Sequence, residues 1–100
     1  MREYELYLVI DGDADDETVA ATVDKVTKLI VAGYGGTGGE MIKVEARGKR
    51  RLAYPIRKKV EGQDVVLNFR TPPRALPEIE RVLKLDEQVL RYLSIRLGDE

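Results

Sequence analysis

The centre of the chain, residues 42–56, reads Ile-Lys-Val-Glu-Ala-Arg-Gly-Lys-Arg-Arg-Leu-Ala-Tyr-Pro-Ile. Apolar and polar side chains alternate up to Arg47, the alternation stops at Gly48, and it resumes from Leu52 to Ile56. Strict alternation is typical of a strand with one face against a core. An isolated glycine inside such a pattern indicates a bulge. The sequence therefore predicts one long strand with a break at Gly48.

A second strand follows the first closely. Val65, Leu67 and Phe69 alternate with more polar neighbours until residues 71–73, Thr-Pro-Pro, end the pattern. Glycine is the residue that most often permits a tight turn, so we place the turn at residues 60–64, around Gly62. The two strands are predicted to form a hairpin.

Each end of the hairpin is flanked by a helix and a strand. A strand is predicted for residues 4–10 and a helix after it, capped by Asp15 or Asp16 and ended by Gly33. A second helix should begin one to three residues after Pro73, and a last strand covers residues 89–97. The apolar residues at helical spacing are Val19, Val23, Val26 and Ile30 in the first helix and Leu76, Ile79, Val82 and Leu83 in the second.

The order strand, helix, strand, strand, helix, strand predicts an α+β fold. Two right-handed crossovers arrange it as a ferredoxin-like βαββαβ unit, a four-stranded antiparallel sheet with both helices on one face. Residues 1–100 would form this single domain. Alternation predicts that the open sheet face carries Tyr7, Val9, Val66, Tyr92 and Arg96. Such a half-apolar face is either a docking site or a set of scattered apolar residues.

Composition excludes most catalytic chemistry. The 100 residues contain no Cys and no His, which removes thiol nucleophiles, disulfides and the commonest neutral-pH base. The acids of residues 11–17 do not have the spacing of a calcium loop, and they fit a polar turn before a helix. The glycines of residues 33–39 lack the Gly-Lys-Ser/Thr of a phosphate loop and predict a flexible connection. We expect no cofactor, no metal and no membrane association.

Positive charge is concentrated in one segment. The formal net charge is -1, yet residues 47–59 hold seven basic residues and no acidic one. A patch of one sign can attract a polyanion that the total charge would not, and about five phosphate contacts would give a salt slope near -4.5. The alternative is a solvated basic edge that protects an edge strand. Charge alone does not choose between them.

Residues 48–56, Gly-Lys-Arg-Arg-Leu-Ala-Tyr-Pro-Ile, resemble the signature of the bacterial small-subunit ribosomal protein six family. Residues 2–5 and 83–92 resemble that family's start and its passage into the last strand. The resemblance implies a ferredoxin-like fold and a structural, non-enzymatic role in the small ribosomal subunit, in the cytoplasm. It also implies binding to the central domain of small-subunit ribosomal RNA together with ribosomal protein eighteen. The glycine-rich connection and Gln63, where the family often has an aromatic residue, depart from the family pattern.

The resemblance also suggests which residues make these contacts. We assign the RNA to Arg2, Tyr4, Arg47, Lys49, Arg50, Arg51 and Arg91, and the partner protein to Tyr54, Arg57 and Lys58. Alternation places Tyr4 and Arg91 on the core side of their strands, so their contact with RNA would require fraying strand ends. It also gives Tyr54 the parity of Leu52 and Ile56, which predicts a packing role.

Two other functions share the predicted fold. An enzyme of the acylphosphatase type would need an Arg cradle and an Asn that orients water, and Asn68, the only Asn, is predicted in mid-strand. A general module for single-stranded RNA would stack bases on aromatic residues of its central strands. Tyr7 and Phe69 fall on opposite faces by alternation, which argues against that platform.

Overall fold

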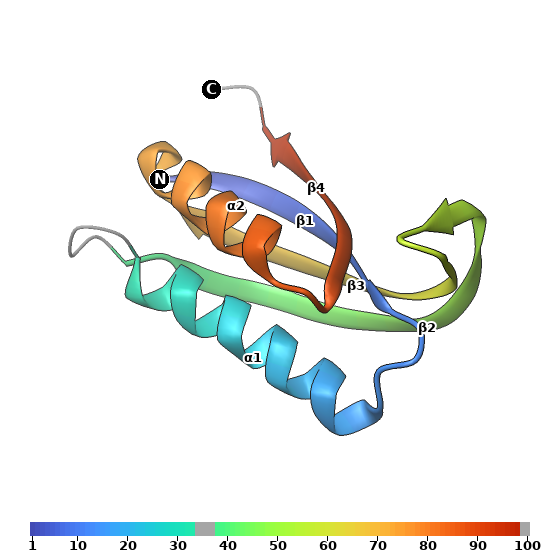
Figure 1. The fold of residues 1–100 in the computed structure, drawn as a ribbon. Coiled ribbons are helices and arrows are strands. Elements are labelled where there is room, and N and C mark those ends of the chain that lie inside the picture. The colour runs from blue at the N-terminus through green and yellow to red at the C-terminus, as the bar shows by residue number, and fades with distance from the viewer. Residues whose placement is uncertain (34–37, 99–100) are drawn as a thin grey trace.

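The computed structural model describes residues 1–33 and 38–98 and has the predicted order of elements (Figure 1). The strands pair in the order β2-β3-β1-β4, every neighbouring pair is antiparallel, and both helices cover the same face. This confirms the ferredoxin-like α+β fold. The predicted glycine-rich connection lies partly in residues 34–37, outside the described residues. The elements are β1 (Arg2–Asp11), α1 (Asp16–Ala32), β2 (Glu40–Ile56), β3 (Lys59–Thr71), a short 3₁₀-helix (Pro73–Ala75), α2 (Leu76–Leu85) and β4 (Val89–Leu97).

The helices begin and end where local chemistry predicts. The Asp15 carboxylate accepts a hydrogen bond of 2.8 Å from the Thr18 backbone N–H, which caps α1. Hydrogen bonding with the Thr18 side chain, and then with its backbone N–H, lowers the pKa of Asp15. Gly33 ends α1 with φ 72°. The helix α2 begins three residues after Pro73, and Pro77 stands in its first turn, where a missing N–H costs little. In residues 1–33 and 38–98, neither helix is long and apolar enough to cross a membrane.

The main core lies between the helices and the sheet. Leucine, isoleucine and valine side chains fill it, and Phe69 is its largest fully buried side chain. This arrangement leaves the opposite face of the sheet without a covering layer (Figure 1). The fully buried members are Leu6, Leu8 and Ile10 of β1, Val26 and Ile30 of α1, Val65, Leu67 and Phe69 of β3, and Ile79 and Leu83 of α2.

A bulge in β4 reverses the faces predicted for that strand. Ile10 pairs with Val89, but the next residue, Val9, pairs with Arg91, so Leu90 is an extra residue in β4. One extra residue moves every later side chain to the other face. The prediction that Tyr92 and Arg96 lie on the open face is therefore wrong. Tyr92 packs against the main core, whereas Leu93 and Ile95 lie on the open face, opposite residues 7 and 5 of β1.

The break predicted in β2 is present. Ala46 pairs with Val65 and Gly48 pairs with Asp64, so Arg47 is the extra residue of a bulge. Gly48 has φ 84°, a backbone conformation that glycine adopts without a steric penalty. The sequence therefore located this bulge correctly.

The hairpin turn lies outside the predicted window. Ile56 pairs with Lys59, and the two residues between them, Arg57 and Lys58, have φ 50° and 67°. Gly62 instead lies within β3. Glycine is needed there because a Cβ at this position would lie 2.5 Å from a Val9 methyl carbon. Close packing, and not turn geometry, accounts for this glycine.

Residues 48–63 are here called the hairpin arm. Gly62 and Gln63 still pair with β1, whereas residues 51–61 extend beyond β1, and the arm curves out of the plane of the sheet (Figure 1). The arm is attached to the sheet by a second apolar cluster of Val9, Leu52 and Leu90, against which Ile56 packs. The same extra residue that shifts β4 thus supplies one side of this cluster. The arm carries most of the basic segment.

Candidate nucleic-acid interface

The arginines near the Gly48 bulge have acidic neighbours. Arg47 Nη2 lies 3.4 Å from Glu45 Oε1, and the Arg47 guanidinium lies 5.8 Å from the centre of the Tyr7 ring. Arg50 Nε lies 2.6 Å from Asp64 Oδ2. Both guanidinium groups are half-exposed, so these contacts are weak ion pairs that an incoming anion can exchange.

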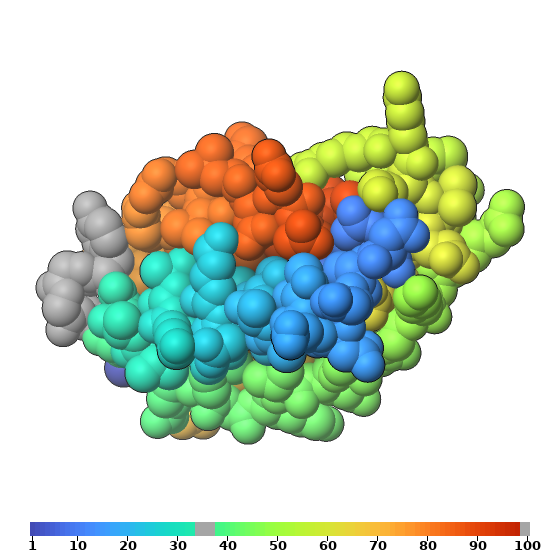
Figure 2. Space-filling model, turned by 60° about the horizontal axis from the view of Figure 1, so that its bottom comes forward, coloured from blue at the N-terminus to red at the C-terminus, as the bar shows by residue number. Residues whose placement is uncertain are grey.

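Lys49, Arg51 and Lys58 are exposed on the hairpin arm. Within residues 1–33 and 38–98, no carboxylate lies within ion-pair distance of these three side chains. Figure 2 shows the arm standing beyond the helices at one end of the molecule, with long side chains projecting from it. The arm therefore presents uncompensated positive charge to solvent.

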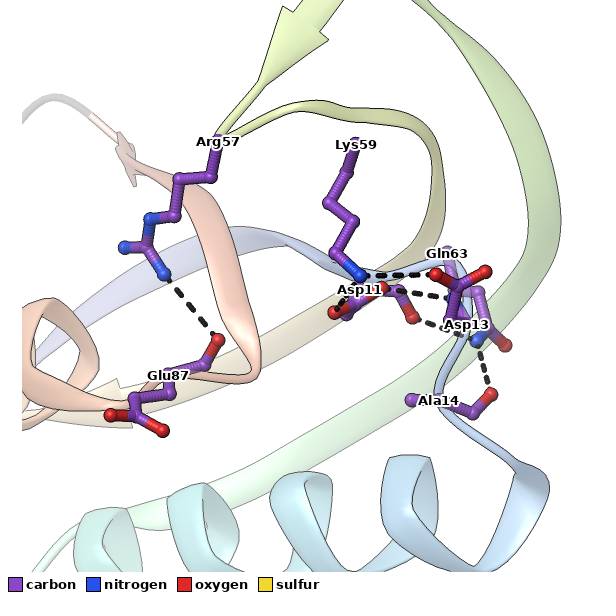
Figure 3. A network of polar contacts seen from close by, with 7 residues as sticks. All are labelled: Asp11, Asp13, Ala14, Arg57, Lys59, Gln63 and Glu87. Atoms are coloured by element: carbon purple, nitrogen blue, oxygen red, sulfur yellow. Dashed lines mark hydrogen bonds and ion pairs between the residues drawn. The ribbon is translucent and has the colours of Figure 1, made fainter.

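Lys59, the last cation of the basic segment, has a structural role. Its Nζ lies 3.0 Å from Asp13 Oδ2 and 3.4 Å from Asp11 Oδ2 (Figure 3). The hydrogen bonds to Asp13 and then to Asp11 raise the pKa of Lys59. Gln63 donates to the backbone carbonyls of Asp11 and Ala14 at 3.1 and 2.9 Å. The acidic turn thus holds the arm at two places, at Lys59 directly after the hairpin turn and at Gln63, the departure from the family pattern, at the base of the arm.

Tyr54 and Arg91 meet on the other side of the arm. Tyr54 is 57% exposed, and its hydroxyl accepts a hydrogen bond of 2.9 Å from Arg91 Nη1. The packing role predicted for Tyr54 is wrong, because the strand pairing becomes irregular after Arg51 and the arm leaves the sheet. The core-side placement of Arg91 is also wrong, because the Leu90 bulge turns Arg91 outward.

Arg57 connects the tip of the arm to the loop before β4. Its Nη1 donates to the Glu87 carbonyl oxygen at 3.4 Å (Figure 3). Together with the Tyr54 hydroxyl contact, this bond holds the arm against the start of β4. The arm is therefore positioned from both sides, which gives its cations a defined geometry.

A shallow hollow of about 350 Å³ lies on the open face beside the arm. Tyr7, Val9 and Leu93 form its apolar part, and Arg50 and Arg91 stand at its rim. Leu93 is 56% exposed and its neighbour Ile95 is 37% exposed. Uninterrupted alternation along β4 would place Leu93 and Ile95 in the core. The residue at the bulge, Leu90, is of no type that would indicate the change of face.

Arg2 and Tyr4 lie at the start of β1, whereas the arm contacts its end. Tyr4 is only 4% exposed, and its ring centroid lies 5.8 Å from that of Phe69. Tyr4 thus contributes to the core, as its alternation predicts. The structure does not bring these two residues together with the arm, and their assignment to RNA stays a prediction.

The two alternative functions find little support in the site. Asn68 Nδ2 lies 3.4 Å from Glu5 Oε2, a carboxylate that would repel a phosphate ester. Phe69 is buried under the helices while Tyr7 lies on the open face, so these two rings form no common stacking platform. Within the described part of the chain, no group of three His, Cys, Asp or Glu residues could hold a metal ion.

The chain is similar to ribosomal proteins over its whole length. The family model described as "Ribosomal protein S6" matches residues 3–96. The small ribosomal subunit protein bS6 of Moorella thermoacetica is 42% identical over 100 residues, covering 100% of this chain and 98% of the relative. The protein of the same name from Beutenbergia cavernae is 43% identical, covering 96% of each chain.

A solved structure agrees with these relatives. The crystal structure of 30S ribosomal protein S6 from Thermotoga maritima has a TM-score of 0.86 and 30% identity, and the match covers 95% of this chain and 86% of that one. The relatives are named as ribosomal proteins and not as enzymes, in agreement with the predicted absence of catalysis. The chain therefore belongs to the ribosomal protein S6 family of the small ribosomal subunit.

Proposed function

We propose that this protein binds the central domain of small-subunit ribosomal RNA together with ribosomal protein eighteen. The observation that carries the RNA part is the set of exposed, uncompensated cations on a fixed arm, Lys49, Arg51 and Lys58. Phosphate contacts position a protein on RNA without chemistry. The protein would thus act by neutralising and holding the RNA backbone.

The ion pairs that the cations already make within the protein limit how strongly it binds RNA. Arg47 and Arg50 must exchange Glu45 and Asp64 for phosphate, so each adds less to RNA binding than Lys49, Arg51 or Lys58. Three phosphate contacts correspond to a salt slope of about -2 to -3. This value is smaller than the five-contact estimate from the sequence. RNA binding by the protein alone should therefore be weak.

The open face is our candidate for the partner protein. Leu93 and Ile95 expose apolar surface beside the hollow, and Tyr54 and Arg91 form a polar rim next to it. An apolar centre with an Arg- and Tyr-containing rim is typical of protein interfaces. A partner seated there would extend the RNA-binding surface that the arm begins. The resemblance gave Lys58 to the partner, but its exposed position on the arm favours the RNA.

RNA titrations at several salt concentrations test the RNA part. Arg51→Gln should flatten the salt slope by about 0.7 to 0.9, the value of one phosphate contact. Lys28→Gln is the matched control, since Lys28 is on α1 and already pairs with Asp24 at 3.0 Å. The slope should hardly change in the control. Equal flattening by both substitutions would mean that only total charge matters and would contradict the proposed arm contact.

A binding assay with ribosomal protein eighteen, without RNA, tests the partner part. Leu93→Asp should weaken this complex at least tenfold, because it places a charge in the apolar centre of the interface. Val31→Asp is the control, since Val31 is similarly exposed at 50% but lies on α1. Equal losses of partner affinity in both variants would count against a partner on the open face. In a separate RNA titration, an RNA affinity that is the same with and without the partner would count against joint binding.

A further inference from the structure

A second group of cations surrounds a separate cleft at the tip of the arm. The cleft has a volume of about 240 Å³, and Arg57 of the arm, Lys84 of α2 and Arg91 of β4 line it. Leu83, Val89 and Leu90 form its apolar floor. The arm and the two consecutive elements α2 and β4 thus each place one basic residue along one cleft, here called the tip cleft.

The charges of the tip cleft are not compensated by its own lining. No carboxylate lines it among the described residues. Arg57 donates to a backbone carbonyl oxygen and Arg91 donates to the Tyr54 hydroxyl, and both acceptors are neutral. In the part of the chain that the structure describes, Lys84 has no carboxylate within ion-pair distance. A guanidinium has five N–H donors, so each arginine keeps donors for a ligand.

The backbone at Arg57 supports a ligand role. Arg57 and Lys58 both have positive φ, 50° and 67°, in a turn that usually favours Asn-Gly. Both residues are exposed, so burial does not explain these identities. Figure 3 shows Arg57 reaching from the turn toward the Glu87 carbonyl, which lies at the entry to β4. Unfavourable backbone conformations of this kind concentrate at ligand sites.

A purely structural explanation covers only part of the cluster. Lys84 is in the last turn of α2, where a cation interacts favourably with the helix dipole. That effect accounts for one of the three charges. It does not explain why Arg57 and Arg91, which come from the arm and from β4, line the same cleft.

We propose that the tip cleft binds one phosphate group of the RNA backbone, held by Arg57, Lys84 and Arg91. The planar guanidinium forks match phosphate oxygens, and Lys84 adds a compact charge. The apolar floor strengthens these contacts by excluding water from one side. This inference rests on the proposed RNA binding, and it adds Lys84, which lies outside the basic segment. It also gives Arg57 to the RNA instead of the partner protein. Arg91 borders both the hollow and the tip cleft, so in this proposal it contacts the RNA where the partner interface ends.

Salt-dependent RNA titration tests the tip cleft. Lys84→Gln should flatten the salt slope by about 0.7 to 0.9, whereas Lys28→Gln, with the same change of charge on α1, should leave it nearly unchanged. Thermal unfolding of both variants verifies that they are folded. The same slope in Lys84→Gln and in Lys28→Gln would overturn the proposal, even if the wild-type protein binds RNA well.

A titration with inorganic phosphate separates this inference from the proposed function. At constant ionic strength, the backbone amide signals of Arg57, Lys84 and Arg91 should shift with phosphate in the wild-type protein and much less in Lys84→Gln. This result supports the cleft even if the RNA fragment fails to bind, which would contradict only the proposed function. The absence of these shifts in the wild type would overturn the phosphate site. Phosphate shifts combined with an unchanged RNA slope in Lys84→Gln would overturn the assignment to RNA.

Discussion

Replacing Leu52 by alanine should detach the hairpin arm from the sheet. Leu52 is 9% exposed and belongs to the small apolar cluster with Val9 and Leu90. It is the buried residue through which the arm contributes to that cluster. Loss of its side chain leaves the arm attached by the partly buried Ile56, by the strand pairing at its base and by the polar contacts of Arg57 and Lys59.

The magnitude follows from the surroundings of Leu52. Leu→Ala substitutions in protein cores cost about 2 to 5 kcal/mol, and the cost falls when the site can collapse. This cluster has three buried members and borders solvent, so we expect about 2 kcal/mol, the lower end of that range. For a domain of this size, the loss lowers Tm by about 8 to 16 °C.

Urea unfolding and thermal unfolding measure this loss, and hydrogen exchange locates it. Exchange should accelerate in residues 48–63 more than in the strands under the helices. Val60→Thr is the control, because Val60 is on the same hairpin, is 50% exposed and keeps its β-branched shape. The control should change stability by less than about 0.5 kcal/mol.

RNA binding by the Leu52→Ala variant is a second measurement of the same effect. Leu52→Ala changes no charge, so weaker RNA binding by the folded variant would reflect the lost position of the arm. A stability cost below about 0.5 kcal/mol, or exchange that does not change in the arm, would refute the idea that Leu52 anchors it.

Four further substitutions test other features. Gly48→Ala should cost about 1 kcal/mol, since φ is 84° but no atom lies within 4 Å of the added Cβ. Gly62→Ala should cost more, about 1 to 3 kcal/mol, because its Cβ would lie 2.5 Å from a Val9 methyl carbon; urea unfolding that ranks them in the reverse order would contradict the packing account. Lys58→Gly should stabilise the protein by up to about 1 kcal/mol, since glycine tolerates φ 67°, and an unchanged or lower urea midpoint would argue against strain in this turn. Burial raises the pKa of Asp86, but hydrogen bonds from Lys25 and from the Gln88 N–H outweigh it, so the pKa lies below 3.8. The stability that this carboxylate adds is present above pH 3.8 and is lost as the pH falls through the lowered pKa. Asp86→Asn should therefore destabilise the protein at pH 7 and much less at pH 2, and an equal loss at both pH values would show that the charge is not responsible.

The sequence predicted the fold well because the signals for its elements are local. Asp15 caps α1, Gly33 ends it, and Pro73 precedes α2, and each of these effects acts within one helical turn. The alternation in β1 and β3 reflects a single buried face, and Gly48 marked the bulge in β2. These residues define the order of elements, from which the topology follows.

The failures arose where tertiary contacts override local preference. Glycine chemistry predicts a turn at Gly62, but this glycine is needed for close packing. Arg57 and Lys58 form the turn, although neither arginine nor lysine favours positive φ. The extra residue Leu90 has no distinctive chemistry. A bulge of this kind becomes visible only when the partner strand is known.

The candidate interface was predictable only in part. The basic segment indicated where positive charge lies, but the sequence could not separate Arg51 from Lys59. Lys59 uses its charge internally, whereas Arg51 has no carboxylate within ion-pair distance in residues 1–33 and 38–98. Lys84 was missed because it is distant in sequence from the segment and resembles an ordinary residue at a helix end. Folding, and not composition, brings it beside Arg57.

The Leu90 bulge makes chain length a determinant of surface chemistry. A substitution in β4 alters one side chain, whereas loss of a single residue at the bulge would exchange the two faces along the remainder of the strand. Leu93 and Ile95 would then turn under the helices, and Tyr92 would turn outward. In evolution, a one-residue deletion here would thus replace the whole exposed stripe at once. Redesign of this face therefore has to preserve the number of residues between Gln88 and Tyr92 before it varies their identities.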